Sequence, residues 1–171
     1  MRAGSNVTCT ITRSALASES DLSITQVGGA GPIALVGERA TEYRVAFSTR
    51  AAGAAGVRVT HSLFWRNAWV QVLAGPAATV DVACQPAQVA PQAQVSCAVT
   101  PRDLFGNAAE VEKPAGAAAI YFSVQAVGSA RDIAVHDAHV TFVAGDASGS
   151  RAGIAVVLAG TRAESIVAVV G

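Results

Sequence analysis

Short stretches of alternating side chains run through the whole of this sequence. In most of them apolar and often β-branched residues occupy every second position, and clusters of Gly, Pro, Asn or Ser separate one stretch from the next. A period of two with turn residues between the stretches is typical of β-strands and not of amphipathic helices. We therefore predict an all-β chain of sandwich type, with a helix content near zero despite its many alanines. The predicted strands are residues 7–12, 43–49, 56–61, 69–73, 79–84, 94–100, 120–124, 139–143, 153–158 and 165–170.

An internal repeat divides the chain into two halves. The matching segments are offset by 88 to 97 residues, which is the length of one immunoglobulin-like sandwich. We predict two tandem sandwiches, residues 1–76 and 77–171, joined semi-rigidly because the junction is too short to act as a flexible tether. Three pairs of segments carry the match: VTCTITRS (7–14) with VSCAVTPR (95–102), residues 43–59 with 139–156, and WVQVLAG (69–75) with SIVAVVG (165–171) at an offset of 96.

The three cysteines fit this repeat. Cys9 and Cys97 occupy the same place in their repeats, and Cys84 lies thirteen residues before Cys97, on the first predicted strand of the second repeat. Pro86 and Pro91 bend the segment between them, which can bring the two Cα atoms within the ~4.4–6.8 Å that a disulfide needs. We predict a Cys84–Cys97 disulfide; the alternative is that both are free cysteines buried in the core.

Cys9 has no cysteine thirteen residues upstream, because that position would precede Met1. We therefore expect the first repeat to lack its first strand, the chain to be a fragment of a longer array, and Cys9 to be unpaired through truncation. A disulfide indicates an oxidising, extracellular compartment. Asn6, in the sequence NVT, is a candidate N-glycosylation site that agrees with such a location.

Two segments resemble a known family. GPIALVGERATEYRVAFSTRAAGAAGVRVTHS (31–62), followed by WVQVLAGPA, resembles a filamin-type immunoglobulin-like repeat. TPRDLFGN (100–107) is similar to a turn of those repeats, in which Asp103, Gly106 and Asn107 would take the positions of positive φ. The paired cysteines make the chain more similar to repeats of large extracellular glycoproteins of green-algal cells and flagella, and of gamete-surface adhesion proteins. The resemblance implies a surface coat or adhesion function at the cell surface.

Several classes of function are excluded by what the sequence lacks. Lys+Arg and Asp+Glu both number 12, and a balanced charge argues against a nucleic-acid partner. Direct membrane insertion is not expected, because no run of about 20 apolar residues is present. We find no phosphate-binding loop and no nucleophile elbow, so we predict no enzyme and no cofactor. His136 and His139 are three residues apart, which on one strand would place them on opposite faces and make a poor metal site.

Both tryptophans occur in one predicted hairpin, HSLFWRNAWVQVL (61–73), with its tip at residues 66–67. The hairpin carries Phe64, Trp65 and Trp69, and strand alternation places Trp69 on the outer face. Aromatic side chains at such a position can be rigid contact anchors. The alternative is that they cover an exposed end of the core or the junction between the repeats.

The leading hypothesis is a non-enzymatic structural and adhesion module of a cell-surface glycoprotein, acting as spacer and as protein–protein contact surface. Its partners would be other protein domains, cell-surface glycoproteins and neighbouring repeats of the same chain. One alternative is a cytoplasmic filamin-type scaffold that binds partner peptides by strand addition. Another is a carbohydrate-binding appendage of a secreted enzyme, with tryptophans stacked on sugar rings.

Overall fold

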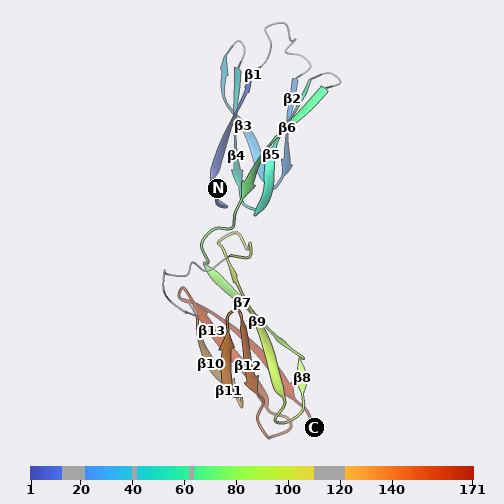
Figure 1. The fold of residues 1–171 in the computed structure, drawn as a ribbon, viewed down its shortest axis with the longest axis vertical. Helices are drawn as coiled ribbons and strands as arrows, with labels where there is room; N and C mark the ends of the chain where they lie inside the picture. The colour runs from blue at the N-terminus through green and yellow to red at the C-terminus, as the bar shows by residue number, and fades with distance from the viewer. Residues whose placement is uncertain (13–21, 40–41, 62–63, 110–121) are drawn as a thin grey trace. The chain divides into compact units, whose positions relative to one another are not determined.

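The computed structural model describes residues 1–12, 22–39, 42–61, 64–109 and 122–171. These residues form fourteen β-strands and no helix. The described residues therefore contain no helix that could span a membrane. They divide into two compact units, Met1–Gly75 and Pro76–Gly171, each of which is a β-sandwich (Figure 1). The predicted all-β sandwich class is confirmed.

Unit 1 has two layers of three antiparallel strands (Figure 1). In one layer β4 (Glu42–Thr49) lies between β1 (Asn6–Thr12) and β3 (Ala30–Arg39); in the other β5 (Gly53–His61) lies between β2 (Leu22–Gly28) and β6 (Phe64–Val72). Alternate residues of each strand point inward, which is why the period of two in the sequence produces one buried face per sheet. The buried side chains between the layers are Val7, Ala30, Val45, Phe47, Ala55, Val57 and Val72.

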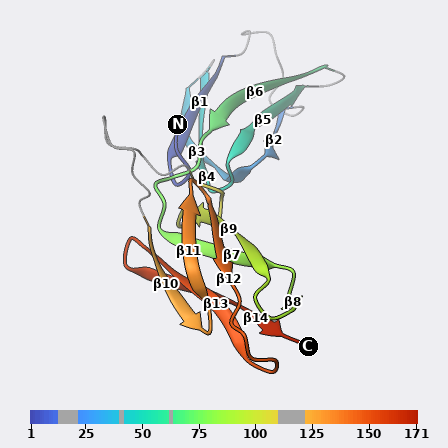
Figure 2. The same ribbon diagram turned by 60° about the horizontal axis from the view of Figure 1, so that its bottom comes forward.

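Unit 2 has two layers of four strands (Figure 2). The first runs in the order β11 (Arg131–His136), β12 (His139–Val143), β9 (Gln94–Arg102) and β7 (Thr79–Gln85). The second runs β10 (Ser123–Gly128), β13 (Arg151–Leu158), β14 (Thr161–Val169) and β8 (Gln88–Val89), with β8 parallel to β14. Its largest fully buried side chains include Val95, Cys97, Val140, Phe142, Ile154, Val156, Val167 and Val169.

The two units share an arrangement of three strands on three. The order β1–β4–β3 matches β9–β12–β11, and β2–β5–β6 matches β10–β13–β14. A parallel bridge between Arg2 and Leu73 corresponds to the pairing of β8 with β14. The described part of unit 1 has no strand at the position of β7.

The register of the last strand pair corrects one detail of the repeat. Gly56 lies opposite Trp69 in unit 1, and Gly153 lies opposite Ile166 in unit 2. With the two glycines taken as equivalent, β6 and β14 are offset by 97 residues and not by the 96 of the sequence alignment. Trp69 therefore matches Ile166, and Val70 matches Val167.

Candidate functional site

The predicted disulfide is formed. Cys84 on β7 lies directly opposite Cys97 on β9, and their sulfur atoms are 2.05 Å apart. The Cα atoms are 3.9 Å apart, closer than we expected, because the two residues face each other on adjacent strands. The Cys84 N–H donates to Ser165 Oγ of β14 at 3.1 Å. The strand β7 is therefore joined to one layer of the sandwich by the disulfide and to the other layer by this hydrogen bond.

Cys9 is a free thiol on β1, at the position that Cys97 occupies in unit 2. It is partly buried, and this desolvation raises the pKa of the Cys9 thiol, because burial disfavours the charged thiolate. Its loss of a partner through truncation stays a prediction. Asn6 at the start of the same strand is exposed, and its glycosylation also stays a prediction.

The hairpin that carries the aromatic residues differs from the prediction. β5 ends at His61, β6 begins at Phe64, and these two residues are register partners. Residues 66–67, the predicted tip, lie inside β6 and pair with β5, so that prediction was wrong. The register set by Gly56 and Trp69 continues without a shift to the ends of both strands, which leaves a connection of only two residues.

Trp65 and Trp69 point to the outer side of the β2–β5–β6 sheet, four residues apart on β6. Their exposed fractions are 62% and 51%. Phe64 is 79% exposed but lies on the other side of the strand, so the three aromatic residues do not form one patch. We name the surface formed by Arg58, Trp65, Asn67 and Trp69 the tryptophan face.

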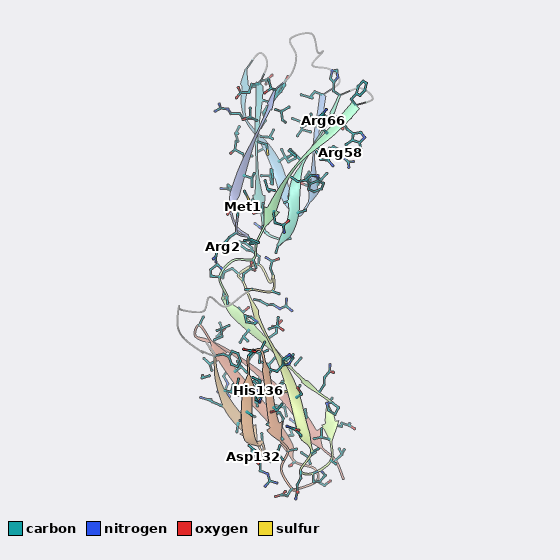
Figure 3. The ribbon with its side chains drawn as sticks, viewed as in Figure 1. Met1, Arg2, Arg58, Arg66, Asp132 and His136 are labelled. Atoms are coloured by element: carbon teal, nitrogen blue, oxygen red, sulfur yellow. A yellow bond between two sulfur atoms is a disulfide. The ribbon has the colours of Figure 1, made fainter. Side chains whose placement is uncertain are left out.

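Contacts within the tryptophan face hold Trp65 in place. The Arg58 guanidinium carbon lies 5.0 Å from the centre of the Trp65 ring, a cation–π distance. The Arg58 Nε–H donates to Asn67 Oδ1 at 3.2 Å, which orients the guanidinium. Figure 3 labels Arg58 among the side chains of unit 1. An indole supported in this way loses little conformational freedom when it meets a partner.

Trp69 packs against the backbone of its own sheet. It lies opposite Gly56 on β5, and a Cβ atom added at Gly28 would be 3.1 Å from Trp69 Cζ3. Part of the indole therefore covers backbone that glycine leaves bare, while about half of it remains in solvent. Trp69 has a structural role in unit 1 as well as an exposed surface.

The turn after β9 has the predicted residues in partly different roles. Only Gly106 has a positive φ, of 83°; Asp103 and Asn107 do not, so two of the three assignments were wrong. Asp103 is 2% exposed and organises the turn through its carboxylate. Its Oδ1 accepts the N–H groups of Phe105 at 2.8 Å and Asn107 at 2.9 Å, and its Oδ2 accepts the Asn107 amide at 2.8 Å. Leu104 is exposed at the tip.

The two neighbouring histidines lie closer than predicted. His136 ends β11, His139 begins β12, and they are direct partners across a two-residue turn, so they share one face. The prediction of opposite faces was wrong because it assumed one continuous strand. In the described part of the chain no three His, Cys, Asp or Glu residues group as metal ligands.

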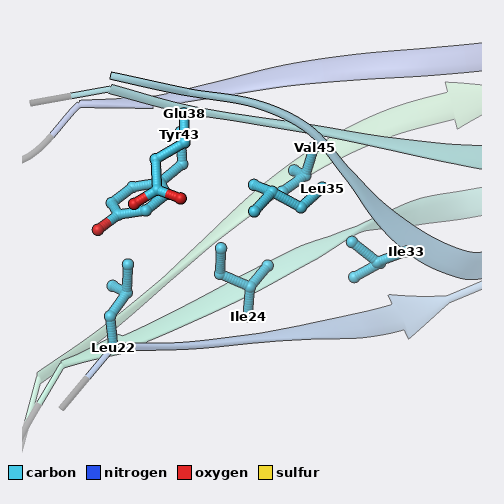
Figure 4. A pocket seen from close by; sticks show the side chains of 7 residues that line it. All are labelled: Leu22, Ile24, Ile33, Leu35, Glu38, Tyr43 and Val45. Atoms are coloured by element: carbon cyan, nitrogen blue, oxygen red, sulfur yellow. The ribbon is translucent and has the colours of Figure 1, made fainter. Parts of the chain in front are cut away.

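A cleft of about 420 Å³ opens between the layers of unit 1. In Figure 4, Leu22 and Ile24 point from β2 toward side chains of β3 and β4 on the other layer. The lining is mostly apolar, with Glu38 and Tyr43 as its polar members. Its other lining residues are Ile33, Leu35 and Val45.

No family model matches the chain, and no curated protein matches it in sequence. Among solved structures it is similar to FdeC, an Escherichia coli adhesin, with a TM-score of 0.50 and 14% identity, covering 99% of this chain and 60% of that chain. Domains 5–6 of the S-layer protein SbsC have a TM-score of 0.40 and 16% identity, with coverages of 99% and 91%. The Yersinia pseudotuberculosis adhesin InvE has a TM-score of 0.39 and 13% identity, with coverages of 98% and 55%.

The similarity to FdeC, at a TM-score of 0.50 and 14% identity, is a similarity of fold. The chain spans 60% of the length of that FdeC chain. The chain therefore has the immunoglobulin-like sandwich fold that is found in this adhesin.

Proposed function

We propose that this chain is a non-enzymatic structural and adhesion module of an extracellular, cell-surface protein. In this proposal the two sandwiches form a semi-rigid spacer, and the tryptophan face of unit 1 is a contact surface for another protein. The observation that carries the proposal is the exposure of both indoles on one sheet face, where Arg58 and the glycine-containing strands support them. Large aromatic side chains that stay exposed on a rigid element are typical of interaction hot spots.

Two observations support the extracellular location. The Cys84–Cys97 disulfide belongs to an oxidising compartment, which weighs against the cytoplasmic scaffold. The fold that the chain shares with FdeC, an adhesin, agrees with a role in adhesion at the cell surface. On its sequence motifs we place the chain with repeats of large surface glycoproteins of green-algal type, with Asn6 as a glycan acceptor and neighbouring repeats among its partners.

A pair of exposed tryptophans is also a surface on which sugar rings stack, so a glycan is the second candidate ligand. The test compares labelled wild-type chain with a Trp65→Ala, Trp69→Ala double variant, on intact cells of the source organism and on a glycan array. Loss of about tenfold or more in cell binding is expected for the double variant. Binding to defined glycans that disappears in the double variant would favour the sugar ligand.

Phe64→Ala is the matched control, because Phe64 is an exposed aromatic residue on the other side of the same strand. This variant should bind cells as the wild type does. Because Trp69 also covers its own sheet, the folding of each variant is checked by circular dichroism before binding is measured. A folded double variant with unchanged cell binding would contradict the proposed contact surface.

A further inference from the structure

The strand β1 lies at the edge of its sheet in the described part of unit 1. In unit 2 the corresponding edge of β9 is covered by β7, which pairs with it over residues 79–85. In unit 1 the strand β1 pairs with β4 on one side, and no described strand pairs with its other side. We name this side the open edge of β1.

The backbone of β1 presents hydrogen-bonding groups along the open edge. Thr49 N–H donates to Ser5 O at 3.1 Å, which fixes the phase of the β1–β4 ladder. Hydrogen-bonded and non-hydrogen-bonded pairs alternate in an antiparallel ladder. The backbone N–H and C=O groups of Cys9 therefore form hydrogen bonds with β4, while those of Thr8 and Thr10 point to the open edge. Rows of such groups are a template for another strand.

In unit 2 the ladder between β9 and β12 has the same alternation of hydrogen-bonded pairs, and the strand β7 pairs with the other edge of β9. Val99 N–H donates to Ala138 O at 2.8 Å, so the backbone groups of Ala98 point away from β12 and toward β7. Ala98 matches Thr10 at the offset of 88, and its partner on β7 is Ala83. The arrangement of β7 on β9 is therefore an internal template for a strand on β1.

The side chains beside the open edge lack the cover that β7 gives in unit 2. There Cys97, Val99 and Val167 are 0%, 3% and 1% exposed, and Val80 of β7 is itself part of the core. Their counterparts Cys9, Ile11 and Val70 in unit 1 are only partly buried. These three side chains form a strip that lies on both layers, at the place where no described strand of unit 1 bridges them.

We propose that the open edge of β1 binds an extended segment of another polypeptide as an added antiparallel strand. The segment carries apolar side chains at alternate positions, as Val80 and Val82 do on β7, and these cover Cys9, Ile11 and Val70. Main-chain hydrogen bonds to Thr8 and Thr10 hold it, and the pockets for alternate side chains select its sequence. The residue opposite Cys9 takes the place that Cys84 has in unit 2.

The test uses a peptide with the β7 sequence TVDVACQ, whose cysteine is activated as a mixed disulfide with nitrothiobenzoate. When the peptide docks, the Cys9 thiolate attacks the peptide sulfur and forms a new disulfide. The activated S–S bond breaks, and nitrothiobenzoate leaves with the electron pair and is measured by its absorbance. Cys84 and Cys97 are already bonded, so Cys9 is the reactive thiol.

Docking raises the local concentration of the peptide at Cys9, so the adduct should form about tenfold or more faster than with a shuffled peptide that keeps its cysteine in place. A peptide with the Ala83→Pro change keeps both valines but lacks an N–H for the ladder, and should react at the shuffled rate. Equal rates for the β7 peptide and its proline form would overturn the proposal.

On the protein side, Thr10→Pro removes one outward N–H and no hydrogen bond to β4, which edge strands tolerate. This variant should lose the rate advantage, whereas the matched variant Thr10→Val, which keeps the N–H, should retain it. If Thr10→Pro does not fold, the two peptides on wild-type chain still decide. A covalent dimer formed without peptide would assign the edge to a second copy and overturn the proposal.

This inference is independent of the proposed adhesion function. Changes in the tryptophan face alter cell binding and leave peptide trapping at Cys9 intact, and Thr10→Pro does the reverse. Failure of one experiment therefore leaves the other to be judged separately.

Discussion

Cys84 on β7 lies directly opposite Cys97 on β9, and the disulfide between them joins the first strand of unit 2 to the middle of its sheet. The Cys84→Ser, Cys97→Ser double variant should lose about 2–4 kcal/mol of the free energy of unfolding of unit 2, because the unfolded chain is no longer cross-linked. Both tryptophans lie in unit 1. Their emission therefore follows unit 1 alone, while circular dichroism follows both units.

The circular dichroism transition of the double variant should move to lower denaturant, with the tryptophan transition unchanged. Reduced wild-type chain serves as the control and should behave as the variant does. Coincident transitions for the oxidised wild type and the variant would show that the cross-link does not stabilise the unit.

Asp103 supports the turn after β9 through three hydrogen bonds to its carboxylate from Phe105 and Asn107. Asp103→Ala should lower the free energy of unfolding of unit 2 by about 1–3 kcal/mol, since the partly buried backbone N–H groups of Phe105 and Asn107 lose their acceptor. Hydrogen exchange should accelerate at the amides of Phe105 and Asn107. Asp103→Asn retains one carbonyl oxygen as acceptor and should lose less; equal losses in both variants would mean that the carboxylate does not organise the turn.

Much of the fold could be predicted from the sequence because the strands that line the cores are rich in β-branched residues. All ten predicted ranges overlap observed strands, although residues 120–121 lie outside the described part. Four of the fourteen observed strands, β2, β3, β8 and β11, were not predicted. The strand β3 was missed because it begins AGP and contains Gly37, residues that normally indicate a turn. β8 was missed because two residues carry no period.

The candidate sites were harder to predict because they depend on register. The sequence shows that Trp65 and Trp69 are four apart, but only the pairing of β6 with β5 shows that Arg58 faces Trp65. The histidine pair could have been recognised from Asp137, since a short polar residue between two strands is a turn signal. The open edge of β1 becomes visible only when the strand order of the two units is compared.

Gly56 allows β5 and β6 to approach closely. A Cβ atom there would collide with the carbonyl oxygen of Ala68 and lie 3.0 Å from its carbonyl carbon. Because both are backbone atoms, Gly56→Ala must push the strands apart, and it should cost about 1–3 kcal/mol of the free energy of unfolding of unit 1. Tryptophan emission during denaturation measures this.

The matched control is Gly37→Ala on β3, where the nearest atom to the added carbon is Arg44 Cβ at 3.7 Å, an ordinary contact. Its effect should stay within about 0.5 kcal/mol. If both variants lower the tryptophan transition equally, close approach at Gly56 is not what limits the packing of this sheet.

Burial raises the pKa of the Cys9 thiol above its ordinary value of 9.0, and this makes the stability of unit 1 depend on alkaline pH. The folded state holds the thiol proton more tightly than the unfolded state does. The protonated Cys9 thiol therefore makes its full contribution to the free energy of unfolding of unit 1 below pH 9.0. This contribution is lost as the pH rises from 9.0 through the pKa of the folded state. The difference in free energy of unfolding between wild type and Cys9→Ser, followed by tryptophan emission, should fall over this range.

The same pKa shift sets the reactivity of the thiol, because only the thiolate is alkylated. At pH 8 Cys9 should react with iodoacetamide more slowly than the cysteine of an unstructured peptide, and the midpoint of its rate against pH should lie above that of the peptide. Alkylation in denaturant is the control, since unfolding removes the burial and should restore the rate of the peptide. A midpoint at or below that of the peptide in the folded chain would show that Cys9 is solvated, and would place the thiol outside the partly buried strip beside the open edge of β1.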